Sequence, residues 1–90
     1  MLDIKYTTQF KKDLKLAKRR NKALLKLEKI INLIAEEKTL PPQLKDHALS
    51  GEFWGYRELH VEPDWLLIYK IIPSEKKVFF ARTGTHSDLF

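Results

Sequence analysis

Five residues in the second half of the chain have side chains suited to acid–base chemistry on a phosphodiester: His47, His60, Asp64, Arg82 and His86. An imidazole exchanges its proton near neutral pH, so one histidine can take the proton of a ribose 2′-hydroxyl while another protonates the leaving 5′-oxygen. An arginine can bind phosphate oxygens through two parallel N–H groups. The set therefore predicts RNA binding or metal-free RNA cleavage.

Each of these residues also has an ordinary structural interpretation. A single histidine in a small domain is more often a surface residue than a catalyst, and Asp64 follows a proline in a turn that it can stabilise. Trp65 and Phe90 can stack on an unpaired base, but Trp65 also opens an apolar strand and can be core. Trp54 is expected in the core. Zinc is not expected, because the chain has no Cys and no histidine pair at helical spacing.

The first half of the chain predicts a short strand and two helices. Residues 2–6 alternate apolar and polar, as a strand does. Thr7 or Thr8 can cap the helix that follows, whose apolar residues recur at i, i+4 and i+7 up to residue 19. A second amphipathic helix is expected over residues 22–37, before two prolines end the helical region. The two helices form a hairpin.

The second half predicts three strands. Residues 53–61, 65–72 and 77–83 are rich in β-branched and aromatic residues and are separated by turn sequences that contain proline. Residues 43–50 are expected to be a loop and residues 85–90 a short tail. The order is β-α-α-β-β-β. We therefore expect one α+β domain over residues 1–90, with a helical hairpin packed on a curved, mainly antiparallel sheet.

In the third of these strands, Val78, Phe80 and Arg82 are expected to share one face, because they alternate along the chain. In the first, Tyr56, Glu58, His60 and Glu62 share a face that is too polar for a core. That face is expected to line either water or a site.

Composition excludes several classes of protein. The chain has 90 residues, 43% of them hydrophobic and 32% charged, which is typical of a small globular domain and not of a disordered or membrane-spanning one. Its first residues do not have the layout of a signal peptide. The absence of cysteine suits the reducing cytoplasm.

The charge is unevenly divided. The net charge of +5 separates into +7 over residues 1–45 and −2 over residues 46–90. A basic surface attracts polyanions such as nucleic acid. The alternative interpretation, that lysine-rich helices are merely well solvated, stays open at this point.

Three segments carry a resemblance to a known family. The sequences KDHALSG at residues 45–51, GYRELHVEPDWLLIYK at 55–70 and RTGTHSDLF at 82–90 closely resemble YafQ-type toxins of the RelE superfamily. The opening strand and the FKKDLK sequence that follows are also similar, so the resemblance covers essentially the whole chain.

The resemblance implies the toxin of a bacterial type II toxin–antitoxin pair, a metal-independent endoribonuclease that cuts mRNA in the ribosomal A site. It implies a central role in cleavage for His86, and it extends the site to His47, His60, Asp64, Trp65, Arg82 and Phe90. Our own interpretation makes His86 the acid or base nearest the scissile phosphate. His60 and Asp64 are then the second proton-transfer group and its orienter, and Arg82 binds the phosphate. His47 completes proton transfer or holds RNA.

The partners implied are an antitoxin, the ribosome and mRNA, with no membrane, metal or cofactor. Contacts with ribosomal RNA are expected from the basic helices, at Lys11, Lys12, Lys15, Lys18, Arg19, Lys22 and Lys26. Two other classes stay open: a gyrase-inhibiting toxin of the ParE kind and a non-catalytic RNA-binding module. The histidine set is an argument against the first.

Overall fold

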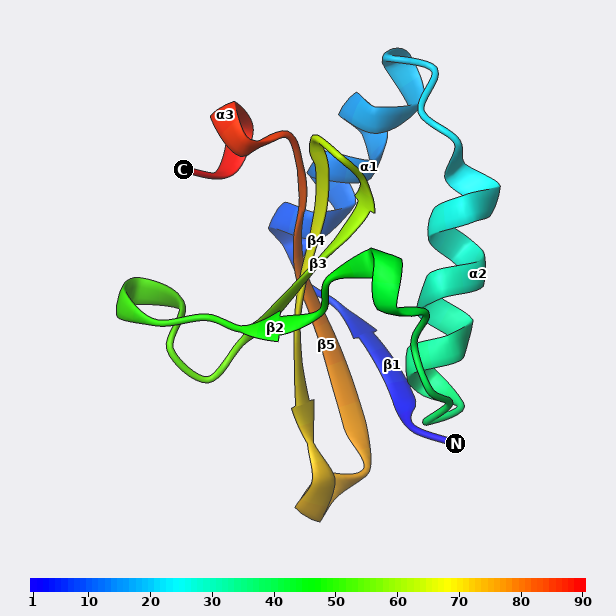
Figure 1. Ribbon diagram of the computed structural model, residues 1–90, viewed down its shortest axis with the longest axis vertical. Coiled ribbons are helices and arrows are strands. Elements are labelled where there is room, and N and C mark those ends of the chain that lie inside the picture. Colours follow the sequence, from blue (N-terminus) through cyan, green and yellow to red (C-terminus); the bar gives the residue numbers. More distant parts are fainter.

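The computed structural model describes all 90 residues, which form an α+β fold (Figure 1). Five strands form one sheet in the order β1-β5-β4-β3-β2. β1 (Asp3–Tyr6) runs parallel to β5 (Lys77–Gly84), and the other neighbours are antiparallel: β4 (Trp65–Ile72), β3 (Arg57–Glu62) and β2 (His47–Ala48). The predicted fold class and the mainly antiparallel sheet are confirmed. None of the helices is long and apolar enough to span a membrane.

The two long helices cover one face of the sheet (Figure 1). α1 (Thr8–Arg19) begins at Thr7, whose hydroxyl accepts a hydrogen bond from the backbone N–H of Phe10 at 3.0 Å. α2 (Leu24–Ala35) is shorter than the predicted helix, since its last turn closes at Glu36 and the next residue takes a left-handed conformation. The helical hairpin is confirmed.

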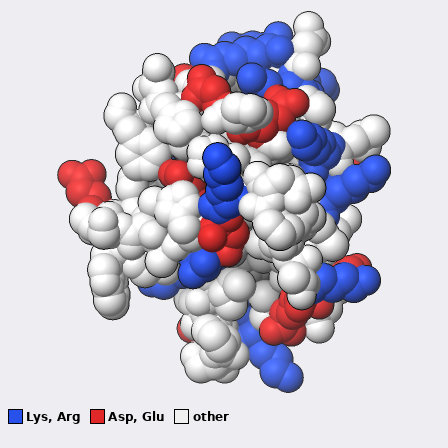
Figure 2. All heavy atoms as spheres, viewed as in Figure 1, with Lys and Arg blue, Asp and Glu red and all other residues white.

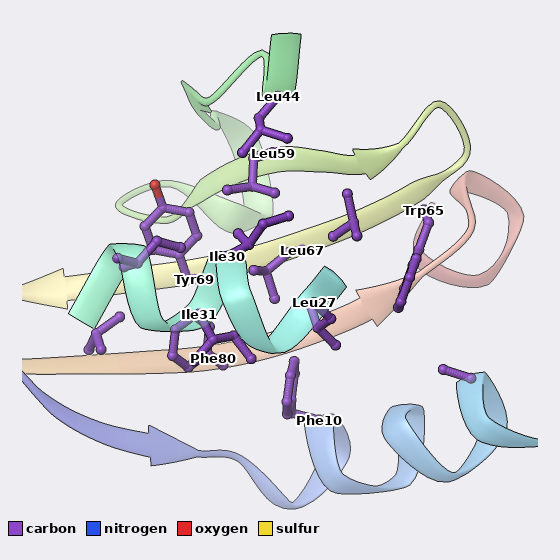
Figure 3. Packing of buried hydrophobic residues seen from close by; sticks show 14 of the residues in the cluster. Phe10, Leu27, Ile30, Ile31, Leu44, Leu59, Trp65, Leu67, Tyr69 and Phe80 are labelled. Carbon is purple, nitrogen blue, oxygen red and sulfur yellow. The ribbon is translucent and has the colours of Figure 1, made fainter. Parts of the chain in front are cut away.

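The main core lies between the helices and the sheet. Figure 3 shows Ile30 and Ile31 of α2 and Phe10 of α1 pointing toward Leu67 and Phe80. Each such side chain, when fully buried, contributes about 1.5–3 kcal/mol of hydrophobic free energy. Because this layer holds the strands in register, it fixes the ends of β3, β4 and β5, where the predicted chemistry-bearing residues lie.

A smaller apolar cluster lies on the other face of the sheet. Leu66 and Ile68 of β4 are fully buried there beneath Leu89, with Phe53 and Tyr56 packed against them. Leu89 belongs to α3 (His86–Leu89), a short helix in the segment that the sequence predicted as a tail. The packing of Leu89 in this second cluster therefore holds the C-terminal segment, including His86, against the sheet.

Two further segment predictions were wrong in detail. The predicted loop over residues 43–50 contains β2, which the two residues His47 and Ala48 form against β3. The strand predicted from Phe53 begins only at Arg57, because residues 51–53 form a 3-10 turn. Gly51, which begins this turn, and Gly55, which follows it, have positive φ angles of +65° and +92°. Short strands and 3-10 turns leave little periodicity in a sequence, so pattern alone does not reveal them.

The alternation predicted for β5 was also wrong beyond Phe80. Phe80 pairs with Tyr69 and Arg82 with Ile68, so Ala81 is an extra residue, a β-bulge, and Arg82 moves to the opposite face from Phe80. The bulge occurs where β1 has ended and α1 covers the open edge of β5. There the Thr7 hydroxyl donates to the Ala81 carbonyl at 2.8 Å.

Candidate active site

His86 and Asp64 form the best-defined polar pair at this end of the sheet. One Asp64 oxygen, Oδ1, accepts the backbone N–H of His86 at 2.9 Å and lies 2.6 Å from the ring atom Nδ1. The backbone hydrogen bond from His86, followed by the side-chain one, lowers the pKa of Asp64. A carboxylate can only accept, so His86 carries a proton on Nδ1, and its Nε2 has no hydrogen-bond partner in the protein. Asp64 was expected to orient His60, but the histidine that it contacts is His86.

The backbone around His86 is held by a capping box at the start of α3. The Thr85 hydroxyl accepts the N–H of Asp88 at 3.1 Å, and the Asp88 carboxylate accepts the N–H of Thr85 at 2.9 Å. A side chain at Gly84 would meet the Asp88 carboxylate at 3.0 Å, so glycine is needed there for close approach. The GTH sequence thus places the His86 ring by backbone geometry as well as by Asp64.

His60 lies between the other two histidines. Its ring centroid is 5.8 Å from that of His86 and 6.5 Å from that of His47. Its Nδ1 lies 3.3 Å from the carbonyl oxygen of Pro63, and a carbonyl can only accept, so Nδ1 carries the proton here too. The three histidines predicted from the sequence therefore lie together, with His60 adjacent to both of the others.

His47 has a carboxylate neighbour that the sequence did not identify. Its Nδ1 lies 2.8 Å from the carbonyl oxygen of Lys45, and its Nε2 lies 3.5 Å from Glu58 Oε1. The Glu58 side chain is only 8% exposed, and its second oxygen, Oε2, has no hydrogen-bond partner. Both ring nitrogens of His47 thus face acceptors. The sequence alone did not indicate this contact, because it depends on the register of β2 on β3, which pairs His47 with Glu58.

Arg82 is not free to bind phosphate with its whole guanidinium. Its Nε and Nη2 donate to Asp13 of α1 at 2.8 and 3.3 Å, while Asp13 also accepts the backbone N–H of Thr83 at 3.1 Å. Asp13 therefore satisfies the open edge of β5 and pairs with the arginine that the bulge turns outward. Only Nη1 of Arg82 has no protein partner, which weakens the predicted two-pronged phosphate contact.

The two tryptophans exchange their predicted places. Trp65 is 1% exposed, and its indole N–H donates to the Thr83 hydroxyl at 2.9 Å, so it is a core residue and not a surface for stacking a base. Trp54, which was expected in the core, is 79% exposed. Phe90 is 65% exposed, so its ring is accessible at the surface.

The sequence and the fold match a known family of proteins. The family model for the bacterial toxin YafQ of type II toxin–antitoxin systems matches residues 2–90. The chain belongs to the YafQ toxin family. The mRNA interferase toxin YafQ of Escherichia coli K12 is 48% identical over 89 residues, which are 98% of this chain and 95% of that protein.

Two solved structures extend the comparison. The toxin in a crystal structure of the Escherichia coli DinJ–YafQ complex superposes with a TM-score of 0.89 and 48% identity, covering 100% of this chain and 99% of that one. A metal-bound toxin from Helicobacter pylori superposes with a TM-score of 0.94 and 41% identity over the full length of both chains. In the present chain no three His, Asp or Glu side chains are arranged to hold a metal ion.

The basic residues predicted to contact the ribosome differ in exposure. Figure 2 shows Lys and Arg gathered over the α1–α2 turn and along α2. Six of the seven residues predicted to contact the ribosome are exposed: Lys11, Lys12, Lys15, Lys18, Arg19 and Lys26. Lys22 is partly buried, with Nζ 6.0 Å from the ring centroid of Trp65, and its charge helps to lower the pKa of Asp64. Lys22 is thus a cation beside the His86–Asp64 pair.

An ion pair connects the helical hairpin to α3. Arg20 donates to both oxygens of Asp88, at 2.7 and 3.3 Å. That hydrogen bond is the main reason why the pKa of Asp88 falls to about 2. The residues are 68 positions apart in the chain, so no sequence spacing could have indicated the contact.

Proposed function

We propose that this chain is an mRNA interferase: a ribosome-dependent endoribonuclease that cuts mRNA in the A site by metal-free acid–base chemistry. The observation that carries the proposal is the His86–Asp64 pair, which leaves Nε2 of His86 without a protein partner, together with a second histidine, His60, at 5.8 Å between ring centroids. Two histidines at this separation can reach the two oxygens on either side of one phosphorus.

The reaction we propose is an in-line transesterification. One imidazole removes the proton of the ribose 2′-hydroxyl, and the 2′-oxygen forms a bond to phosphorus as the bond to the 5′-oxygen breaks. The other imidazole, in its protonated form, gives a proton to that leaving oxygen. The upstream fragment then ends in a 2′,3′-cyclic phosphate. His86 and His60 fill these two roles because each has its Nδ1 proton held by an acceptor and its Nε2 available.

The charge that grows on the phosphoryl oxygens needs a nearby cation. Lys22 supplies it in our proposal, since its charge already acts on Asp64, and Nη1 of Arg82 is a second donor. His47, with acceptors at both ring nitrogens, is suited to holding positive charge near the RNA rather than to transferring a proton.

The partners follow from charge and family. The exposed lysines and arginines of the helical hairpin are suited to ribosomal RNA phosphates, which supply affinity without sequence preference. An antitoxin partner is supported by the DinJ complex of the Escherichia coli relative. We place the protein's action in the bacterial cytoplasm, where translating ribosomes are.

Mapping cut ends on ribosomes programmed with a defined message tests this proposal. Wild-type protein should release a fragment cut within the A-site codon, and EDTA should leave the rate unchanged. His86→Ala should lower the rate by roughly 10²–10⁴-fold and keep a normal circular dichroism spectrum. Intact message together with altered DNA supercoiling in growth-arrested cells would instead favour a gyrase inhibitor. Binding without cleavage would favour a non-catalytic module.

A further inference from the structure

Three aromatic residues, the consecutive pair Phe53 and Trp54 and the last residue Phe90, leave part of their surface exposed. Trp54 is 79% and Phe90 65% exposed, and Phe53 is half-buried with its ring 5.7 Å from that of Phe90 at an interplanar angle of 73°. We call these three residues the aromatic surface. In Figure 1 the loop that carries Phe53 and Trp54 extends on the same side of the molecule as α3, and Figure 2 shows that this side is mostly uncharged.

Backbone hydrogen bonds hold the loop over residues 49–56 both at its base and within its turn. The backbone N–H of Leu49 donates to Tyr56 at 2.9 Å, that of Trp54 to Gly51 at 3.1 Å, and that of Tyr56 to Phe53 at 2.9 Å. Gly51 and Gly55 adopt the left-handed conformations that this turn requires. The exposed indole of Trp54 is therefore presented by an ordered backbone, although the fold gains no burial from it.

The aromatic surface is directly connected to the catalytic segment. Phe90 donates its backbone N–H to the carbonyl of His86 at 2.9 Å, and its ring meets Phe53. A cation lies beside it, because Nζ of Lys70 is 5.3 Å from the ring centroid of Tyr56, which in turn is 6.2 Å from that of Phe53. Exposed aromatic rings next to a lysine are the combination that binds single-stranded nucleic acid, with bases on the rings and phosphate at the cation.

We propose that the aromatic surface binds one unstacked base of the RNA adjacent to the cut phosphodiester, with Trp54 as the stacking platform and Lys70 near the backbone phosphate. This inference rests on the proposed RNA cleavage and adds to it a residue that selects or holds the flanking nucleotide. The site is independent of the imidazole chemistry, so its loss weakens RNA binding without altering the His86–Asp64 pair.

The test combines variants with abasic nucleotides on programmed ribosomes. Trp54→Ala should lower kcat/KM by about 5- to 150-fold, the usual value of one base–aromatic stack, while Trp54→Tyr keeps most of the activity. An abasic nucleotide at one flanking position should cause a similar loss in the wild type and no further loss in Trp54→Ala. Leu25→Ala, which removes a 75% exposed side chain from α2, is the matched control and should cleave normally.

A second readout does not require cleavage. In a His86→Gln background, a short single-stranded RNA should quench the emission of exposed Trp54, and Trp54→Ala should abolish that quenching because Trp65 is buried. Quenching without any cleavage by the wild type would leave this site standing and overturn the proposed function. Wild-type cleavage and RNA affinity in Trp54→Ala, or losses that multiply with the abasic nucleotide, would overturn the site. So would a Trp54→Ala defect confined to antitoxin binding.

Discussion

Replacing Asp64 separates the orientation of His86 from its chemistry. Asp64 accepts two hydrogen bonds from His86, one from the backbone at 2.9 Å and one from Nδ1 at 2.6 Å. Asp64→Ala removes both acceptors, and the His86 side chain, 53% exposed, becomes free to rotate. Asp64→Asn keeps an amide oxygen in the same place and removes only the charge.

The size of each effect follows from this geometry. A free imidazole ring has about three χ1 wells and two ring orientations, so lost orientation lowers the rate about sixfold. An exposed ion pair of this kind gives a factor of up to about five toward the imidazolium. Asp64→Asn should therefore lose about fivefold in rate and Asp64→Ala about 30-fold. Both losses are smaller than the roughly 10²–10⁴-fold loss expected for His86→Ala.

Single-turnover cleavage on programmed ribosomes measures these rates, and thermal unfolding serves as the control. Asp64 is 65% exposed, so stability should barely change in either variant. Wild-type cleavage by Asp64→Ala would show that His86 does not need this anchor. A loss in Asp64→Asn as large as that in His86→Ala would show that the carboxylate itself transfers the proton, and the orienting role would be wrong.

Three further predictions concern the elements around the site. Tyr69→Phe should lower the free energy of unfolding by about 1.5–3 kcal/mol in denaturant titrations, because the buried Tyr69 hydroxyl bonds to the Asp46 carboxylate; an unchanged midpoint would contradict this. The pKa of Asp88 is lowered to about 2, so its contribution to stability is present above about pH 4 and is lost as pH falls toward 2. The stability gap between wild type and Asp88→Asn should therefore close over that interval, and a constant gap would refute the role of Arg20. The third prediction replaces four exposed basic residues with Glu: Lys11, Lys15, Lys18 and Arg19. This charge reversal should weaken co-sedimentation with ribosomes and make it less dependent on salt. Binding as tight as that of the wild type would mean that the basic face has no docking role.

Much of the fold was predictable because its long elements are strongly periodic. β4 was predicted with its observed bounds, since a run of large apolar residues between two turns, interrupted only by Lys70, leaves little choice. The helical hairpin and its Thr7 or Thr8 cap followed from the same kind of pattern. The short elements β2 and α3 did not, because two and four residues have too little periodicity.

The candidate site was predictable in its residue types and less so in its pairing. His86, His60 and Asp64 do lie together, but the β3–β4 turn directs Asp64 to His86, and a tight turn does not reveal this direction from spacing. The bulge at Ala81 similarly reversed the face expected for Arg82. The burial of the two tryptophans was predicted wrongly, because the sequence does not distinguish a large aromatic side chain exposed on an ordered loop, such as Trp54, from one in the core.

The central claim is that the 2′-hydroxyl of the RNA is the nucleophile and that histidines move the protons. The most direct measurement compares three programmed messages that differ only at the cut nucleotide, which carries a 2′-hydroxyl, a 2′-hydrogen or a 2′-O-methyl group. We expect cleavage of the first message alone, in the presence of EDTA, with an upstream fragment that ends in a 2′,3′-cyclic phosphate or its 3′-phosphate. Cleavage of the 2′-deoxy message at the normal rate, or an upstream fragment that ends in a 3′-hydroxyl, would contradict the mechanism.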